Sequence, residues 1–215
     1  MVIHYYEEIV HIKVNSIKIE GSLEIPANAK GIVLFAHGSG SSRYSPRNNF
    51  VAQVLRQNGL ATLLIDLLTE TEDLIYKTRF DIDLLTDRLL TATKWLQNNA
   101  KTEKLSISYF GASTGAAAAL KAAARLGKQI NTVVSRGGRP DLAEPDLPKI
   151  QSPTLLIVGG NDEAVLELNQ DAYNKLTVEK ELVIIPGATH LFGEPGALEE
   201  VANLAATWFK QHFLI

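Results

Sequence analysis

The order of apolar and polar residues divides this chain into two parts. Residues 9–14 and 17–26 alternate apolar and polar side chains, which is typical of antiparallel strands with one face in water. Asn15 and Ser16 separate these two runs and favour a turn between them. Residues 31–36 then read Gly-Ile-Val-Leu-Phe-Ala, an unbroken apolar run that indicates a strand buried on both faces.

After this run, segments with helical spacing alternate with short apolar runs. We expect helices at residues 46–58, 78–99, 116–126, 165–176 and 197–212. We expect further strands at residues 61–65, 105–110, 132–134, 154–158 and 182–185. This alternation predicts an α/β fold, a mostly parallel sheet of about eight strands with helices on both faces and an antiparallel edge. No repeat or linker divides the chain, so residues 1–215 are interpreted as one domain.

Composition narrows the classes of function. Hydrophobic residues make up 46% and charged residues 21%, which fits a soluble globular protein. The net charge of −3 leaves no basic excess to neutralise phosphates, which argues against a nucleic-acid partner. The chain has no cysteine, which excludes disulfides, a cysteine nucleophile and thiolate metal sites. It shows neither signal-peptide features nor a bilayer-length apolar run, so we expect a cytoplasmic protein without a membrane partner.

A Gly-x-Ser-x-Gly turn joins the strand at 105–110 to the alanine-rich helix. Residues 111–115 read Gly-Ala-Ser-Thr-Gly, and such a turn holds its serine in a strained conformation that exposes the hydroxyl. Ser113 is therefore the candidate nucleophile. The pattern is short, and the alternative is a glycine-rich corner with an incidental serine.

A serine nucleophile needs a histidine as general base and a carboxylate that orients the histidine. In this sheet architecture the chain order is serine, acid, histidine. Only His190 and His212 follow Ser113. His190 comes after the strand at 182–185, in a strand-exit loop, whereas His212 lies in the last turns of the final helix, so His190 is the candidate base.

Asp162 is the candidate acid because it follows the strand at 154–158 through Gly-Gly-Asn. Its competing role is to cap the next helix, which aspartate does well. Asp141 is the second candidate for the acid and Glu163 the third. The two oxyanion donors are assigned to the backbone N–H groups of Thr114 and, within one residue, Ser39.

Ser39 belongs to a loop of small residues that follows the first buried strand and begins at His37. His37 precedes the serine and so breaks the expected order. We interpret His37 as a structural residue that shapes this loop.

These motifs together resemble the α/β-hydrolase superfamily and, within it, the dienelactone hydrolase-like branch. The matching residues are 37–40 (His-Gly-Ser-Gly), 111–115, 159–162 (Gly-Gly-Asn-Asp) and 187–190 (Gly-Ala-Thr-His). Dienelactone hydrolases proper use a cysteine nucleophile, whereas this chain has Ser113. The resemblance therefore implies a serine hydrolase that acts on small carboxylic esters or lactones.

The segment between the strands at 132–134 and 154–158 is too short for a helical lid, so we expect an open site. Arginines cluster near it, and arginine binds carboxylates in bidentate fashion. An anionic ester is therefore one hypothesis, and internal salt bridges to Asp141, Glu144 or Glu194 are the alternative. Candidate substrate-binding residues are Arg43, Arg136 and Arg139, with Arg47 in the same cluster.

The sequence thus favours an enzyme that needs neither a metal nor an organic cofactor and acts on a small-molecule ester. The same triad would serve an acyltransferase, an amidase or a peptidase, and the fold also occurs without activity. A nucleotide-binding role is poorly supported because residues 159–162 lack the dinucleotide-binding glycine spacing.

Overall fold

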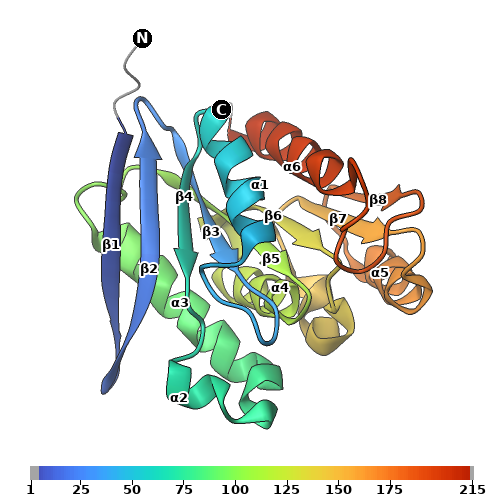
Figure 1. Ribbon diagram of the computed structural model, residues 1–215, viewed down its shortest axis with the longest axis horizontal. Coiled ribbons are helices and arrows are strands. Elements are labelled where there is room, and N and C mark those ends of the chain that lie inside the picture. Colours follow the sequence, from blue (N-terminus) through green and yellow to red (C-terminus); the bar gives the residue numbers. More distant parts are fainter. Residues whose placement is uncertain (1–4, 214–215) are drawn as a thin grey trace.

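In the computed structural model of the protein, which describes residues 5–213, eight strands form one sheet in the order β1-β2-β4-β3-β5-β6-β7-β8 (Figure 1). The strands are β1 (Tyr5–Val14), β2 (Ile17–Pro26), β3 (Gly31–Ala36), β4 (Ala61–Ile65), β5 (Ser106–Ala112), β6 (Ile130–Arg136), β7 (Thr154–Gly159) and β8 (Lys180–Ile185). β1 and β2 pair antiparallel, as do β2 and β4, and all other neighbours pair parallel. The predicted α/β fold with an antiparallel edge is confirmed.

The alternating pattern of β1 has the expected physical cause. Val10, Ile12 and Val14 are buried against the core, whereas His11 and Lys13 between them are exposed. Val14 lies opposite Ile17, so the turn at residues 15–16 sets the register of the whole pair. β3 is buried along its entire length, which explains its continuous apolar run.

Residues 5–213 contain six α-helices, and all but the short α2 pack on the two faces of the sheet. They are α1 (Pro46–Gln57), α2 (Glu70–Asp73), α3 (Ile82–Asn98), α4 (Thr114–Leu126), α5 (Glu163–Lys175) and α6 (Ala197–Phe213). α1 and α6 share one hydrophobic core on one face, and α3 and α4 share a second core on the other (Figure 1). Every helix except α2, whose four residues are all polar, presents buried apolar residues to the core, as the spacing of those residues predicts. None of the helices within residues 5–213 is both long and apolar enough to cross a membrane.

The structure differs from the expected elements at two places in particular, the start of α3 and the segment between β6 and β7. The helix expected at 78–99 begins only at Ile82, because Asp81 caps it by accepting a hydrogen bond from the N–H of Leu84 at 3.0 Å. The residues before it form α2 and a short 3₁₀ helix, Tyr76–Phe80. The segment between β6 and β7 contains a further 3₁₀ helix, Pro140–Lys149, which packs against α4 and α5 instead of joining the strands directly.

The turn from β5 into α4 depends on glycine at two positions. A Cβ atom at Gly111 would collide with the backbone of Ala116, and one at Gly115 would collide with the carbonyl oxygens of Ala36 and His37. The first turn of α4 therefore lies directly on the carboxyl end of β3, closer than any other residue would allow.

We predict that Gly115→Ala lowers the free energy of unfolding by about 2 kcal/mol or more, because the added methyl group must displace backbone and not a flexible side chain. Urea unfolding followed by circular dichroism measures this. Gly193→Ala is the matched control, since a Cβ atom there meets nothing within 4 Å. Equal midpoints for the two variants would contradict the packing described here.

Candidate active site

Ser113 occupies the turn between β5 and α4 in a backbone conformation that is rare for residues other than glycine. Its φ is 50° and its ψ is −121°, a strained region that costs about 1–3 kcal/mol. Hydrogen bonds hold it there: its N–H donates to the carbonyl of Arg136 at 3.2 Å, and its carbonyl accepts from the N–H of Arg139 at 3.2 Å. Backbone strain that the surroundings enforce in this way is typical of a functional turn.

The structure brings Asp162 and His190 together from two neighbouring strand-exit loops. His190 Nδ1 lies 2.6 Å from Asp162 Oδ2. Asp162 stands at the N-cap position of α5, yet its side chain makes no capping hydrogen bond. Of the two roles weighed for Asp162, the geometry therefore favours the one in which it orients the imidazole. With Nδ1 donating to this carboxylate, Nε2 is the acceptor.

Ser113 and His190 line one small pocket of about 200 Å³ at the carboxyl ends of the strands. Ser39, whose N–H was assigned as an oxyanion donor, lines the same pocket. Thr114 is the first residue of α4, so its N–H has no partner within the helix. The other residues that line the pocket are Gly38, Ser41, Ser45, Arg47, Asn48, Ala112, Arg136 and Leu191.

Unlike Asp162, the remaining candidates for the acid form no hydrogen bond to His190 among the described residues, and the other candidate base does not line this pocket. Asp141 accepts two hydrogen bonds from Arg139, and Glu163 is the first residue of α5. His212 is engaged at the end of α6, where its Nδ1 lies 2.8 Å from the carbonyl oxygen of Trp208. Among residues 5–213, no group of three or more histidine, aspartate or glutamate side chains has the arrangement of a metal site.

His37 is buried below the loop that carries Ser39. Its Nε2 accepts a hydrogen bond from the N–H of Leu67 at 3.0 Å, and Nδ1 donates to the carbonyl of Gly38 at 2.9 Å. Burial lowers the pKa of His37 below its ordinary value of 6.5, because the charged imidazolium would lose its hydration. The contacts of His37 are those of a neutral histidine that shapes the loop, as its place in the sequence suggests.

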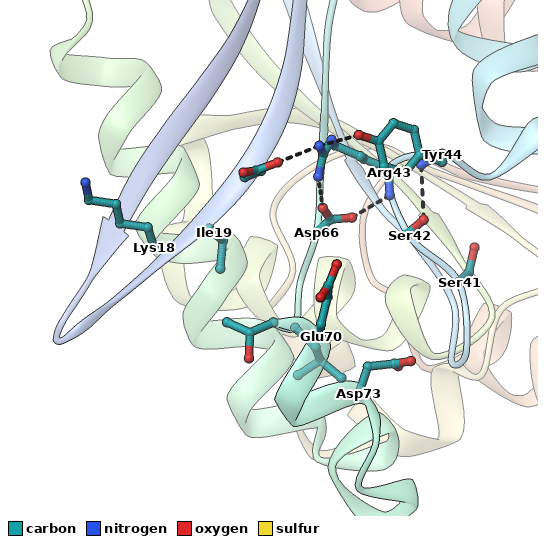
Figure 2. A pocket seen from close by; sticks show the side chains of 12 residues that line it. Lys18, Ile19, Ser41, Ser42, Arg43, Tyr44, Asp66, Glu70 and Asp73 are labelled. Atoms are coloured by element: carbon teal, nitrogen blue, oxygen red, sulfur yellow. Dashed lines mark hydrogen bonds and ion pairs between the residues drawn. The ribbon is translucent and has the colours of Figure 1, made fainter.

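Two of the three arginines named as substrate-binding candidates are held by carboxylates. Arg43 is buried in an ion pair with Asp66 and also binds Glu20 at 2.5 Å. Figure 2 shows its guanidinium directed at Asp66, in a separate pocket of about 610 Å³ that does not include Ser113. Arg139 forms a bidentate pair with Asp141 at 2.7 and 2.9 Å. Both residues therefore form internal salt bridges: Arg139 pairs with Asp141, as the alternative expects, whereas Arg43 pairs with Asp66 and Glu20, which the alternative does not name.

Arg136 differs from them. It ends β6, is buried, and lines the Ser113 pocket with Arg47 and Asn48. Its Nη2 donates to Asn48 Oδ1 at 3.3 Å, and its guanidinium carbon lies 5.8 Å from the centre of the Phe192 ring. Burial, together with the nearby positive charge of Arg47, lowers the pKa of Arg136 to about 10. Asn48 carries no sequence signal that would have identified it.

The chain as a whole is similar to known proteins. The family model described as "Dienelactone hydrolase family" matches residues 19–213. The chain belongs to this family. A dienelactone hydrolase from Anabaena variabilis has a crystal structure with 57% identity and a TM-score of 0.94, covering 97% of this chain and 98% of that one. Est1E from Butyrivibrio proteoclasticus, solved with ferulic acid, shares the fold at 18% identity and a TM-score of 0.83, covering 96% of this chain and 100% of that one.

Curated relatives in two strains of Mycobacterium tuberculosis are 52% identical over 206 residues and carry the name "Putative phosphoribosyl transferase". The match covers 96% of this chain but 46% of each relative. This chain therefore spans about half the length of the curated relatives that it matches.

We predict that His37 makes the protein less stable in acid. Because the pKa of His37 is lowered in the folded state, only the unfolded chain takes up this proton as the pH first falls below 6.5. The free energy of unfolding then decreases by up to about 1.4 kcal/mol per pH unit until the folded pKa is reached. His37→Gln should remove this component.

Urea unfolding between about pH 7.5 and pH 5 measures the difference in slope. Identical slopes for wild type and His37→Gln would contradict the prediction.

Proposed function

We propose that this protein is a serine hydrolase that cleaves small carboxylic esters or lactones through an acyl-enzyme on Ser113. The observation that carries the proposal is the Asp162–His190 hydrogen bond of 2.6 Å, together with a strained Ser113 that lines the same pocket as His190. Membership of the dienelactone hydrolase family supports the reaction class.

The reaction follows from these positions. Ser113 Oγ attacks the ester carbonyl carbon while His190 Nε2 takes its proton, and Asp162 stabilises the imidazolium through Nδ1. The N–H groups of Thr114 and Ser39 donate to the oxyanion. As the tetrahedral intermediate collapses, His190 returns the proton to the departing alkoxide. A water molecule then attacks the acyl-enzyme by the same steps, releasing the acid and restoring Ser113.

The acyl-enzyme is the shared intermediate of the other reactions that this triad can perform. An amine or alcohol that attacks in place of water would give acyl transfer, and an amide substrate would give peptidase or amidase activity. A panel of matched esters and amides, with and without an added acceptor alcohol, separates these reactions by their products. A fold without catalysis predicts no product from any of them.

We infer that the transferase name of the mycobacterial relatives refers to the half that this chain does not match. The dienelactone hydrolase family model covers residues 19–213, so the part of the relatives that this chain matches is their hydrolase-like part. The purified chain should therefore transfer no phosphoribosyl group from phosphoribosyl diphosphate.

We predict that a fluorophosphonate probe labels the wild type and that Ser113→Ala abolishes both labelling and ester hydrolysis, because the nucleophile is lost. Intact-protein mass spectrometry locates the adduct. Thr114→Ser is the matched control, since it changes the adjacent side chain but retains the backbone N–H. Labelling that persists in Ser113→Ala would place the nucleophile elsewhere.

We predict that Asp162→Asn lowers kcat by on the order of 10³–10⁴-fold, because an amide does not hold His190 in the tautomer that leaves Nε2 free. Steady-state kinetics with a 4-nitrophenyl ester measure this. Asp141→Asn removes the other candidate carboxylate and should retain kcat within a few-fold, since Asp141 binds Arg139. A larger loss in Asp141→Asn than in Asp162→Asn would reverse the assignment.

A further inference from the structure

The pocket beside Ser113 contains a guanidinium that the surrounding protein does not satisfy. Arg136 is 7% exposed, and its Nε and Nη1 have no hydrogen-bond partner. Its one hydrogen bond to another side chain, at 3.3 Å, goes to the neutral amide oxygen of Asn48. A buried charge is normally paired with an opposite charge, so this arrangement calls for a partner that the described residues do not supply.

Arg47 adds a second charge to the same pocket. Its Nε is also buried without a hydrogen-bond partner, and its charge acts on Arg136. Every other arginine of the chain forms an ion pair with a carboxylate. These are Arg43, Arg56, Arg79, Arg88, Arg125 and Arg139. The two exceptions within residues 5–213 therefore meet in the pocket that holds the proposed nucleophile.

The beginning of α1 contributes to the same wall. Ser45 caps this helix of 12 residues, and Arg47 and Asn48 lie in its first turn. All three line the pocket. The N-terminal end of a helix carries a partial positive charge, so the helix adds to the field of the two guanidinium groups instead of opposing it.

We propose that Arg136 and Arg47, at the N-terminal end of α1, form a subsite for an oxyanion of the substrate. This inference rests on the proposed function and specifies its substrate class: an ester that carries a carboxylate or a phosphate in addition to the scissile bond. Two adjacent positive charges favour a doubly charged group, so we expect phosphate to bind more tightly than a carboxylate. The pocket volume of about 200 Å³ restricts the group to a small one.

Binding can be tested without catalysis. Inorganic phosphate at millimolar concentration should raise the Tm of the wild type and of Ser113→Ala by a few degrees, and acetate should raise it less, at equal ionic strength. Arg136→Gln should lose this rise. Arg139→Gln is the matched control, because it removes the same charge from an arginine that binds Asp141, and it should keep the rise.

Catalysis provides the second measurement. The ratio of kcat/KM for 4-nitrophenyl hemisuccinate to kcat/KM for 4-nitrophenyl butyrate should fall roughly 10–100-fold in Arg136→Gln and in Arg47→Gln, as expected for the loss of a charged hydrogen bond. An ester with a phosphate in place of the free carboxylate compares the two anions. Arg139→Gln should keep the wild-type ratio.

The outcomes separate the two proposals. A phosphate-dependent rise in Tm that Arg136→Gln abolishes supports the subsite, whether or not an ester is hydrolysed. The absence of ester hydrolysis would contradict only the proposed function. The subsite is overturned if esters are hydrolysed and the ratio of kcat/KM for the anionic ester to kcat/KM for the neutral ester is the same in all variants. It is also overturned if Arg136→Gln retains the phosphate-dependent rise in Tm. If Arg136→Gln does not fold, Arg136→Lys and Arg47→Gln are measured instead. The subsite is supported if the ratio of kcat/KM for the anionic ester to kcat/KM for the neutral ester falls in Arg47→Gln and is partly kept in Arg136→Lys. Wild-type ratios in both variants overturn the subsite.

Discussion

The site depends on two places where backbone packs directly on backbone. Gly115 lets the first turn of α4 rest on the carbonyl oxygens of Ala36 and His37, so the loop that carries Ser39 lies beside Ser113. Gly159 lies in the same way against the backbone of Ala188 and Thr189, which brings the loop of Asp162 to the loop of His190. Neither of these backbone contacts leaves room for a side chain. Loops packed in this way fix the positions of their residues, and catalytic sites require such fixed positions.

The same packing explains why Ser113 accepts its unfavourable conformation. Its N–H and carbonyl group bind the end of β6 and the residues just after it, at Arg136 and Arg139. β6 therefore positions the serine from one side while the end of β3 supports it from the other. The strain is local, and the buried sheet on which these strands lie is large enough to sustain it.

Sequence reasoning succeeded where a short-range pattern decides structure. Alternation located β1 and β2, and the apolar run located β3. The order of residues on strand exits selected Asp162 and His190, which the structure then places 2.6 Å apart. It failed at α2, although residues 69–72 read Thr-Glu-Thr-Glu, a capping box that the structure contains and that could have revealed the helix. The 3₁₀ helix at Pro140–Lys149 shows no comparable periodicity, because its contacts with α4 and α5 define it.

The arginines show the limit most clearly. Arg136 and Arg139 lie three positions apart in the sequence, and the sequence pattern around them does not distinguish their roles. Asp141 is close enough in sequence to pair with either, yet β6 ends at Arg136 and turns that side chain inward, while Arg139 lies beyond the turn with Asp141 beside it. The point at which β6 ends thus decides which of the two arginines pairs with Asp141. A local sequence pattern does not reveal this point.

Burying the charged side chain of Arg136 costs free energy. Burial and the nearby charge of Arg47 lower the pKa of Arg136 to about 10, which corresponds to roughly 3 kcal/mol of unfavourable free energy for the charged side chain in its buried position. A hydrophobic side chain would incur no such penalty at this position, since Phe192 already provides an apolar neighbour. A penalty of that size, beside a strained serine and a hydrogen-bonded acid–base pair, is the pattern expected where function opposes stability. An anion in the pocket would reverse the sign of the contribution, raising the pKa of Arg136 and stabilising the folded state when the substrate binds.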